Sequence, residues 1–193
     1  QSTDSGLVWK ATKEGDTYQD GSVYTTGADY AEYFQTTDGL AINAGYFVSL
    51  SDGLGTVEVG NREIIGVVSA TPVVVGDSAE NSWQGKYLTD KFGVPEMSLQ
   101  AVLDIDGEDT GEVVQARTLN PSYDASKVYV PRSVRPEWVP VGLFGKLWVY
   151  YDGSVSVGDK LASNSDGKGI ISDTGYRILK VKPDDGIALI LFK

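Results

Sequence analysis

The chain has 193 residues and carries 27 acidic against 16 basic side chains, a formal net charge of −11. Its hydrophobic fraction of 41% is typical of a globular protein with a buried core, which excludes a long disordered chain. The acidic balance argues against nucleic-acid and anionic-membrane partners, because both bind basic surfaces.

Neither cysteine nor histidine occurs in the sequence. This excludes disulfides, thiolate zinc sites, cysteine nucleophiles and a Ser-His-Asp triad. Any chemistry must therefore use carboxylates, hydroxyls, lysines, amides or backbone groups. We expect no metal site and no evident cofactor.

The N-terminal stretch QSTDSGLVWK (1–10) shows neither an initiator methionine nor a signal-peptide profile. We therefore expect a piece of a longer polypeptide. No apolar run approaches the length of about 20 residues that a membrane-spanning helix needs. A membrane partner is not expected.

Two short helices are predicted in the first half of the chain. In ADYAEYF (28–34) three aromatic residues fall at i, i+3 and i+4, a helical spacing. In that register Asp29 and Glu32 share one face of the helix. The second helix is predicted over NSWQGKYLTDKFG (81–93), which begins with polar residues and ends at a glycine.

The remaining regular structure is predicted to be β. Runs rich in Val, Ile, Leu and Tyr are separated by Asp-Gly pairs, a pattern typical of antiparallel hairpins. The runs are 45–50, 63–70, 143–151, 176–182 and 187–193. The Asp-Gly pairs begin at Asp20, Asp38, Asp52, Asp106, Asp152, Asp166 and Asp185. The fold class is therefore mainly β.

The middle of the chain differs in composition from its flanks. DIDGEDTGE (104–112) holds five acidic residues and predicts an exposed turn, since the spaced ligand pattern of a calcium loop is missing. The stretch 118–140 carries four prolines and predicts an extended, irregular crossing. We expect an acidic, proline-rich arm near 104–140 that joins two lobes, residues 29–104 and 138–193.

The residues alone leave the role of Asp29 and Glu32 open. Two acids three positions apart are typical of a solvated face, and they are also compatible with a reaction site. The glycine-rich stretch 53–60 lacks the Lys-Ser/Thr pair of a phosphate-binding loop. Exposed tryptophans and tyrosines could bind sugar, although in a β protein they more often lie in a core or interface.

The order of several motifs resembles one known family. DYAE (29–32) is followed by GDS (76–78) and WQGKY (83–87), and then by RPEW (135–138) and VGLFGK (141–146). This order is similar to the peptidase G2 family, the autoproteolytic intramolecular chaperone domain at the C-terminus of Bacillus-phage neck appendage (tailspike) proteins. The resemblance runs almost continuously from residue 27 to residue 193.

The resemblance implies a domain that ends a long fibrous protein, helps three chains to form a homotrimer and then cuts itself away. In the family the cut precedes the Asp of the D-x-x-E motif, which places it here between Ala28 and Asp29. Residues 1–28 would then end the upstream spike region, the other expected partner, and residues 29–193 would form the released chaperone. The implied location is a virion appendage precursor assembled in the cytoplasm of the bacterial host.

The resemblance also implies that Asp29 and Glu32 are the catalytic pair. Neighbouring carboxyl groups can keep different protonation states, so one could activate a water while the other protonates the departing amide. We favour Glu32 as the base, because Asp29 lies on the leaving side of the bond. Direct attack by the Asp29 carboxylate on the Ala28 carbonyl is the competing mechanism. Ala28 itself has no hydroxyl nucleophile.

Three further polar residues, Asp77, Ser78 and Lys86, are candidates for supporting groups. No phosphate-binding loop is found, and the sequence leaves a nucleotide role in release open. Two alternative functions are a trimerisation cap that does not cleave and a carbohydrate-binding domain at a fibre tip.

Overall fold

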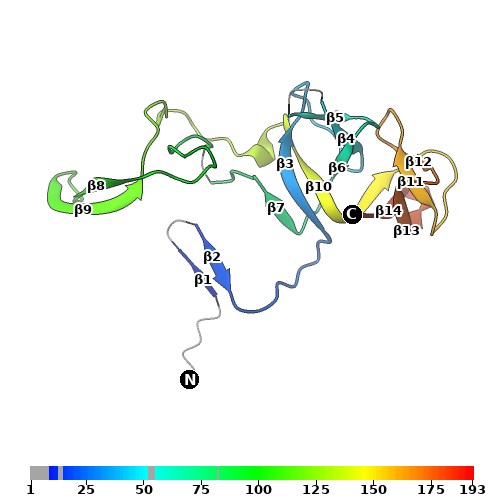
Figure 1. The fold of residues 1–193 in the computed structure, drawn as a ribbon, viewed down its shortest axis with the longest axis horizontal. Coiled ribbons are helices and arrows are strands. Elements are labelled where there is room, and N and C mark those ends of the chain that lie inside the picture. Colours follow the sequence, from blue (N-terminus) through cyan, green and yellow to red (C-terminus); the bar gives the residue numbers. More distant parts are fainter. Residues whose placement is uncertain (1–8, 13–14, 52–54, 82) are drawn as a thin grey trace, which may run out of the picture.

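The computed structural model describes residues 9–12, 15–51, 55–81 and 83–193 (Figure 1). In this part of the chain the regular structure is β, apart from two single turns of 3-10 helix, η1 (Arg132–Val134) and η2 (Pro183–Asp185). The fold class is therefore mainly β, as predicted. The strands are β1 (Trp9–Ala11), β2 (Thr17–Gln19), β3 (Asp29–Gln35), β4 (Phe47–Leu50), β5 (Val57–Val59), β6 (Ile64–Val68), β7 (Val74–Gly76), β8 (Met97–Leu103), β9 (Asp109–Arg117), β10 (Trp138–Tyr150), β11 (Lys160–Ser163), β12 (Gly169–Ile171), β13 (Tyr176–Lys182) and β14 (Ile187–Phe192).

The main sheet is organised around β10, a strand of 13 residues. The sheet runs in the order β12-β11-β13-β14-β10-β6-β4-β5, and β3 joins β10 and β7 off this path. β10 pairs antiparallel with β3 and β6 through its first half and with β14 through its second half. This change of partner bends the sheet into a half-barrel (Figure 1).

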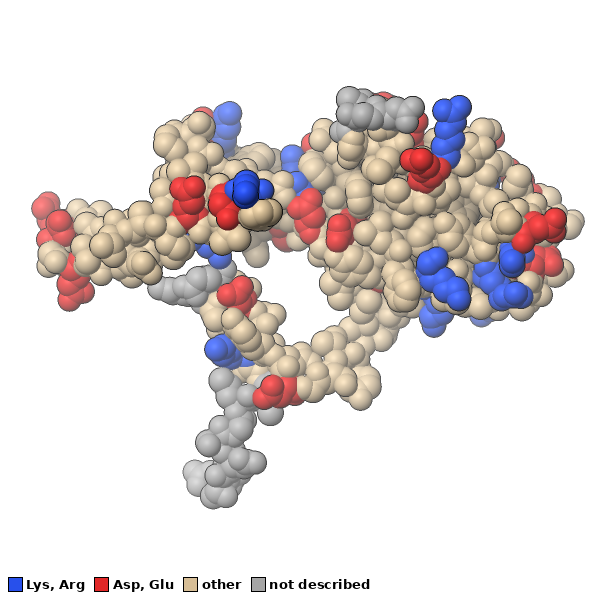
Figure 2. Space-filling view, in the orientation of Figure 1, with Lys and Arg blue, Asp and Glu red and all other residues tan. Residues whose placement is uncertain are grey.

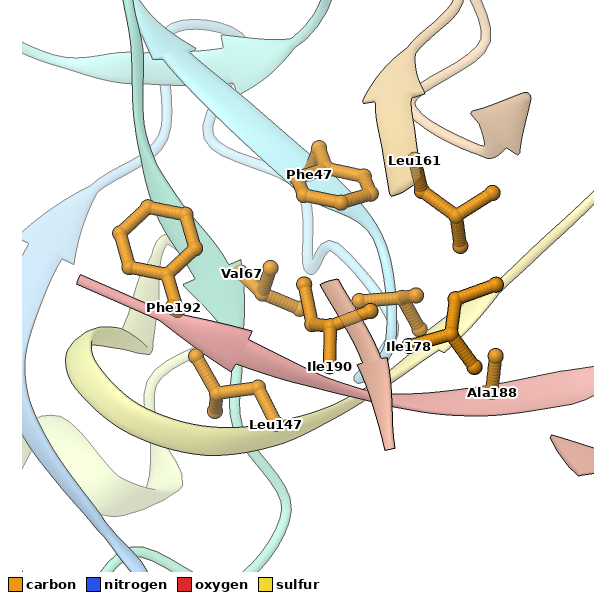
Figure 3. Close-up of a cluster of buried hydrophobic side chains, with 9 residues drawn as sticks. Phe47, Val67, Leu147, Leu161, Ile178, Ala188, Ile190 and Phe192 are labelled. Atoms are coloured by element: carbon orange, nitrogen blue, oxygen red, sulfur yellow. The ribbon is translucent and has the colours of Figure 1, made fainter. Parts of the chain in front are cut away.

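Two groups of buried side chains lie against this sheet. They cover opposite faces of β4 and β6, because neighbouring residues of each strand belong to different groups. One group comes from β4, β6, β10, β11, β13 and β14, and its members point toward one another (Figure 3). The second group consists of valines from β4, β5, β6 and β10. The first group contains Phe47, Val67, Leu147, Val149, Leu161, Ile178, Ala188, Ile190 and Phe192, and the second contains Val48, Val57, Val68, Val139 and Val141.

The predicted helix over 28–34 is wrong, because these residues form strand β3. Burial alternates in β3, with Asp29 and Ala31 buried and Tyr30 exposed between them. β3 pairs with β10 on one edge and with β7 on the other. Hydrogen bonds on both edges stabilise the extended chain more than a helix of two turns, which is marginal in water.

The predicted helix over 81–93 is wrong as well. Its described residues form turns and isolated β-bridges, and Ser82 lies outside the described residues. Gly85 and Gly93 adopt positive φ angles of 77° and 83°, which a right-handed helix does not contain.

The predicted division into two lobes is also wrong. Strands from residues 29–68 and strands from residues 138–192 belong to one sheet, because β10 pairs with both sets. The part that stands apart is instead the hairpin of β8 and β9, a separate two-stranded sheet (Figure 1).

The acidic stretch 104–112 is exposed, as predicted, but only residues 104–108 form the turn, because residues 109–112 begin β9. The turn connects β8 to β9, and the Asp104 carboxylate accepts backbone N–H bonds from Asp106 and Glu108. Figure 2 shows acidic side chains at the tip of this hairpin, where water solvates them. The proline-rich stretch is irregular up to residue 137, but its last three residues begin β10.

All five predicted strands coincide with observed ones, namely β4, β6, β10, β13 and β14. The Asp-Gly pairs at Asp106, Asp166 and Asp185 lie in hairpins, as predicted. The pair at Asp152 follows β10, which does not pair with the next strand, β11. The pair at Asp52 lies outside the described residues.

The hairpin of β1 and β2 forms a third sheet, which shares no ladder with the others. Residues 20–28 connect it to β3 without regular structure (Figure 1). Within the described residues no helix is long and apolar enough to cross a membrane.

We predict that Ile190→Ala lowers the free energy of unfolding by about 2–5 kcal/mol, because it leaves a cavity in the larger core group. The control is Ile171→Ala on β12, a side chain that is 51% exposed. It should change stability by about 0.5 kcal/mol or less. Urea titrations at one protein concentration measure both, and equal losses would contradict this core assignment.

Candidate functional site

The first residue of β3 lies between two neighbouring strands. In the β3–β10 pairing Asp29 lies opposite Gly145. On the other edge the Val73 backbone N–H, just before β7, donates to the Asp29 carbonyl at 2.8 Å. The peptide bond that precedes Asp29, the predicted cleavage site, is thus held where the sheet begins.

The Asp29 carboxyl group is buried, with only 5% of the residue exposed. Burial raises the pKa of this carboxyl, and hydrogen bonds from Ser69 and from the backbone N–H of Asp29 itself offset the rise only in part. Its Oδ2 atom has no hydrogen-bond partner among the described residues. The carboxyl therefore holds its proton to a higher pH than an exposed aspartic acid does, and it lies beside its own backbone nitrogen, which is the leaving atom of the predicted cut.

A cavity of about 260 Å³ adjoins this carboxyl. Its wall comes from residues 44–45, from the end of β6 and the segment after it (68–71), and from residues 146–148 and 150 of β10. A volume of this size holds several water molecules. The Asp29 side chain therefore has a space beside it into which water can enter.

The Ala28 carbonyl accepts a hydrogen bond from the backbone N–H of Lys146 at 3.1 Å. Gly145, the residue before this donor, has a φ of +123°. A Cβ atom at Gly145 would lie 2.3 Å from the Ala28 carbonyl oxygen, so only glycine allows this approach. Ala28 and Lys146 are both exposed residues, so this hydrogen bond joins two surface positions.

Glu32 lies on the other face of β3. Residues three apart on a strand point to opposite sides and are separated by about 10 Å. The Glu32 carboxylate accepts a hydrogen bond of 2.5 Å from the Tyr30 hydroxyl, and this bond raises the pKa of Tyr30. Gly76 of β7 packs beside both side chains.

The predicted shared face of Asp29 and Glu32 is therefore wrong. It assumed a helical register, and the strand turns the two carboxyl groups away from each other. Within one chain the structure does not bring the two acids together. Their catalytic role stays a prediction.

Asp77 lies in the turn after β7, and its polar contacts hold this turn in place. Its carboxylate pairs with Arg132 at 2.5 Å and accepts a hydrogen bond from Gln84. Arg132 is 4% exposed and also donates hydrogen bonds to the Asp77 carbonyl and to the Gln84 side chain. Its guanidinium stacks on the Trp138 ring, with the guanidinium carbon 3.5 Å from the ring centroid. Ser78 is half-buried in the same turn.

Lys86 lies further along the chain, with its ammonium over the rings of Tyr87 and Tyr123. These contacts give Asp77 and Lys86 structural partners. The supporting roles of Asp77, Ser78 and Lys86 stay predictions.

Three tryptophans pack within the fold. Trp83 packs edge-on against Tyr129, Trp138 lies under Arg132, and Trp148 lies under the Lys182 ammonium at 4.6 Å. This agrees with the structural role that tryptophans usually have in a β protein.

Sequence reasoning missed four residues of this region, Ser69, Arg132, Gly142 and Gly145. Gly142 is buried on β10, and a Cβ there would lie 3.0 Å from Asp29 Oδ2. Gly145 gave a signal, because a glycine inside the predicted strand 143–151 indicates close approach of another backbone, whereas Gly142 lies just before that predicted strand. Ser69 and Arg132 gave none, since their partners are distant in sequence.

Among the described residues no group of acidic side chains is arranged to hold a metal ion. The site therefore offers one buried carboxyl, a backbone N–H donor and an adjoining cavity. The class that this fold and site define is a mainly β domain that holds the predicted cleavage bond beside a buried carboxyl and a backbone N–H donor.

Comparison with known proteins identifies the family. The model of the Peptidase_G2, IMC autoproteolytic cleavage domain matches residues 6–185. The pre-neck appendage protein of Bacillus phage B103 is 34% identical over 174 residues, which are 87% of this chain and 19% of that protein. The chain thus spans about a fifth of that relative.

Two solved structures of bacteriophage phi29 gene product 12 are similar as well. The pre-mature protein gives a TM-score of 0.78 at 29% identity, over 96% of this chain and 24% of that chain. The C-terminal fragment gives a TM-score of 0.67 at 31% identity, over 86% of this chain and 100% of that chain. The chain belongs to the Peptidase_G2 family of IMC autoproteolytic cleavage domains, and the predicted resemblance is confirmed.

We predict that Asp29→Asn stabilises the folded chain at neutral pH. A carboxyl pKa that is raised on folding means that the native state binds more protons, so stability falls as pH rises from about 4 through the raised pKa. Asparagine has no such loss. The comparison is made between Glu32→Gln and the double variant with Asp29→Asn, so that neither chain is expected to be cut.

Urea midpoints at one protein concentration measure this effect across pH. The advantage of the double variant should be largest near pH 7 and should shrink below about pH 4, where Asp29 is neutral in both states. A difference that does not change with pH would contradict a raised pKa of Asp29.

Proposed function

We propose that this domain assembles the appendage protein into a homotrimer and then cuts itself free by hydrolysis of the Ala28–Asp29 bond. The observation that carries the proposal is the placement of this bond, whose leaving nitrogen lies beside the buried Asp29 carboxyl. Residues 1–28 then remain with the upstream spike region, and residues 29–193 leave as the chaperone. The phi29 C-terminal fragment, which matches 86% of this chain over its own full length, supports a separate downstream domain.

Asp29 acts as the acid in this mechanism. Burial raises the pKa of its carboxyl, which favours a protonated form that can act as an acid, and the group lies next to the nitrogen that must be protonated when the bond breaks. Water adds to the Ala28 carbonyl carbon and the bond to the Asp29 nitrogen breaks. The products are a carboxylate at Ala28 and an amine at Asp29.

Glu32 acts as the base from a second copy of the chain. Four positions of extended chain, about 13 Å, separate it from Ala28 on the same strand, and its carboxylate is bonded to the Tyr30 hydroxyl, so it does not reach the Ala28 carbonyl. In a homotrimer the Glu32 of a neighbouring copy can approach this carbonyl. Cleavage then waits for assembly, because a lone chain lacks its base.

The proposed location follows from the relatives, which are phage appendage proteins. The precursor assembles in the host cytoplasm and becomes part of the virion. Trimeric β fibres fold slowly, because they pair residues that are far apart in sequence. A template that holds three chains in register shortens their conformational search. Its removal after assembly leaves the product kinetically trapped.

We predict that the purified wild-type chain yields two masses, those of residues 1–28 and 29–193. Asp29→Ala and Glu32→Gln should each remain at a single uncut mass, since each variant lacks one of the two carboxyl groups. Intact mass spectrometry of fresh protein measures this. The control is Glu58→Gln, an exposed glutamate on strand β5 of the same sheet, which should be cut like the wild type.

Full cleavage of Glu32→Gln would contradict the role of Glu32 as base and favour direct attack by the Asp29 carboxylate on the Ala28 carbonyl. A wild type that stays uncut but forms trimers would favour the non-cleaving cap.

We predict that Asp29→Asn and Glu32→Gln chains complement each other when they are co-expressed with different tags. In mixed trimers the Glu32 of the first chain can cut the second chain, which still has Asp29. The fragment 1–28 should therefore appear with the tag of the Glu32→Gln chain alone. If co-expression gives no fragment although mixed trimers form, Glu32 does not act between copies.

A further inference from the structure

Any attack on the Ala28 carbonyl gives a tetrahedral intermediate with negative charge on its oxygen. This holds whether a water or the Asp29 carboxylate attacks. Enzymes that break amide bonds lower this barrier with fixed hydrogen-bond donors at about 2.7–3.1 Å from the oxygen. The roles of Asp29 and Glu32 leave this requirement unmet, so a donor must come from elsewhere in the fold.

One donor already lies at this oxygen. The backbone N–H of Lys146 points at the Ala28 carbonyl oxygen with an N···O distance of 3.1 Å. Ala28 precedes β3, so this bond continues the β3–β10 ladder by one residue beyond the strand. The donor therefore reaches the bond that is to be cut.

β10 is shaped to make this approach. Its register against β3 shifts between Gly142 and Phe144, which marks a β-bulge at Leu143. Bulges of this kind occur next to active sites, where they redirect the backbone. Gly145 then takes a φ of +123° and brings its Cα, without a Cβ, against the Ala28 carbonyl.

The donor is also held rigidly. Lys146 pairs with Leu191 in the β10–β14 ladder. The next residue, Leu147, is 3% exposed and belongs to the larger core group. A donor fixed by the core needs no rearrangement when charge develops, which is the condition for electrostatic catalysis.

We propose that the backbone N–H of Lys146 is the oxyanion donor of self-cleavage, presented by the bulge and by Gly145 of β10. This inference rests on the proposed cut between Ala28 and Asp29. As the attacking oxygen adds to the Ala28 carbonyl carbon, the carbonyl oxygen becomes negative and the Lys146 N–H bond to it strengthens. The carbonyl re-forms when the bond to the Asp29 nitrogen breaks and that nitrogen takes a proton.

The test replaces the peptide bond before residue 146 with an ester, which removes the N–H and keeps the lysine side chain. The cleavage rate of the full chain should fall about 10²–10³-fold, the usual effect of losing one oxyanion donor. The control is an ester at Thr36, whose N–H donates to the Glu137 carbonyl at 2.8 Å at the other end of the β3–β10 ladder. This control should be cut at the wild-type rate.

A second pair of variants tests the same geometry without an ester. Gly145→Ala places a Cβ against the Ala28 carbonyl oxygen and should abolish cleavage. Gly158→Ala imposes a comparable strain at a φ of +95° where no atom lies within 4 Å, and it should leave the rate unchanged. Both chains are compared for trimer formation and circular dichroism.

Equal slowing by the esters at 146 and 36 would overturn the inference, since it would reflect ladder stability alone. A wild-type rate for the 146 ester would overturn it as well, while cutting of the wild type between Ala28 and Asp29 would leave the proposed function intact. An uncut wild type would instead refute the proposed function, and the inference with it.

Discussion

The pairing of β3 with β10 is the interaction on which the rest of this structure depends. β10 belongs to both halves of the sheet, because it pairs with β3 and with β14. The same strand contributes Leu147 and Val149 to the larger core group and lies beside Asp29. Its bulge and glycines would weaken an ordinary central strand. Here they let another backbone come close, and that backbone carries the bond proposed to break.

This arrangement buries the Asp29 carboxyl, and that burial lowers the stability of the folded chain. A carboxyl with an unpaired oxygen beside a cavity destabilises the folded chain at neutral pH. Such a group is expected where chemistry rather than stability decides the residue. Arg132 contacts both Asp77 and Gln84 and so holds the turn after β7, the strand that pairs with the other edge of β3.

Local patterns predicted much of the β structure. Strand β13 was predicted with its observed bounds, and β14 to within one residue, because an apolar run and an Asp-Gly turn are both local signals. The stretch 28–34 misled the same reasoning, since its aromatic spacing fits a helix when neighbours are ignored. Only pairing with β10 and β7, more than a hundred and about forty positions away, makes it a strand.

The sequence by itself determined the chemistry available to this protein and, through its motif order, the family. Without cysteine or histidine, any chemistry is left to carboxylates, hydroxyls, lysines, amides and backbone groups. The tertiary structure decided where these groups lie. It turned Asp29 and Glu32 to opposite faces and brought the Lys146 N–H to the Ala28 carbonyl, because strand register fixes the position of every backbone group and no local pattern encodes the register between distant strands.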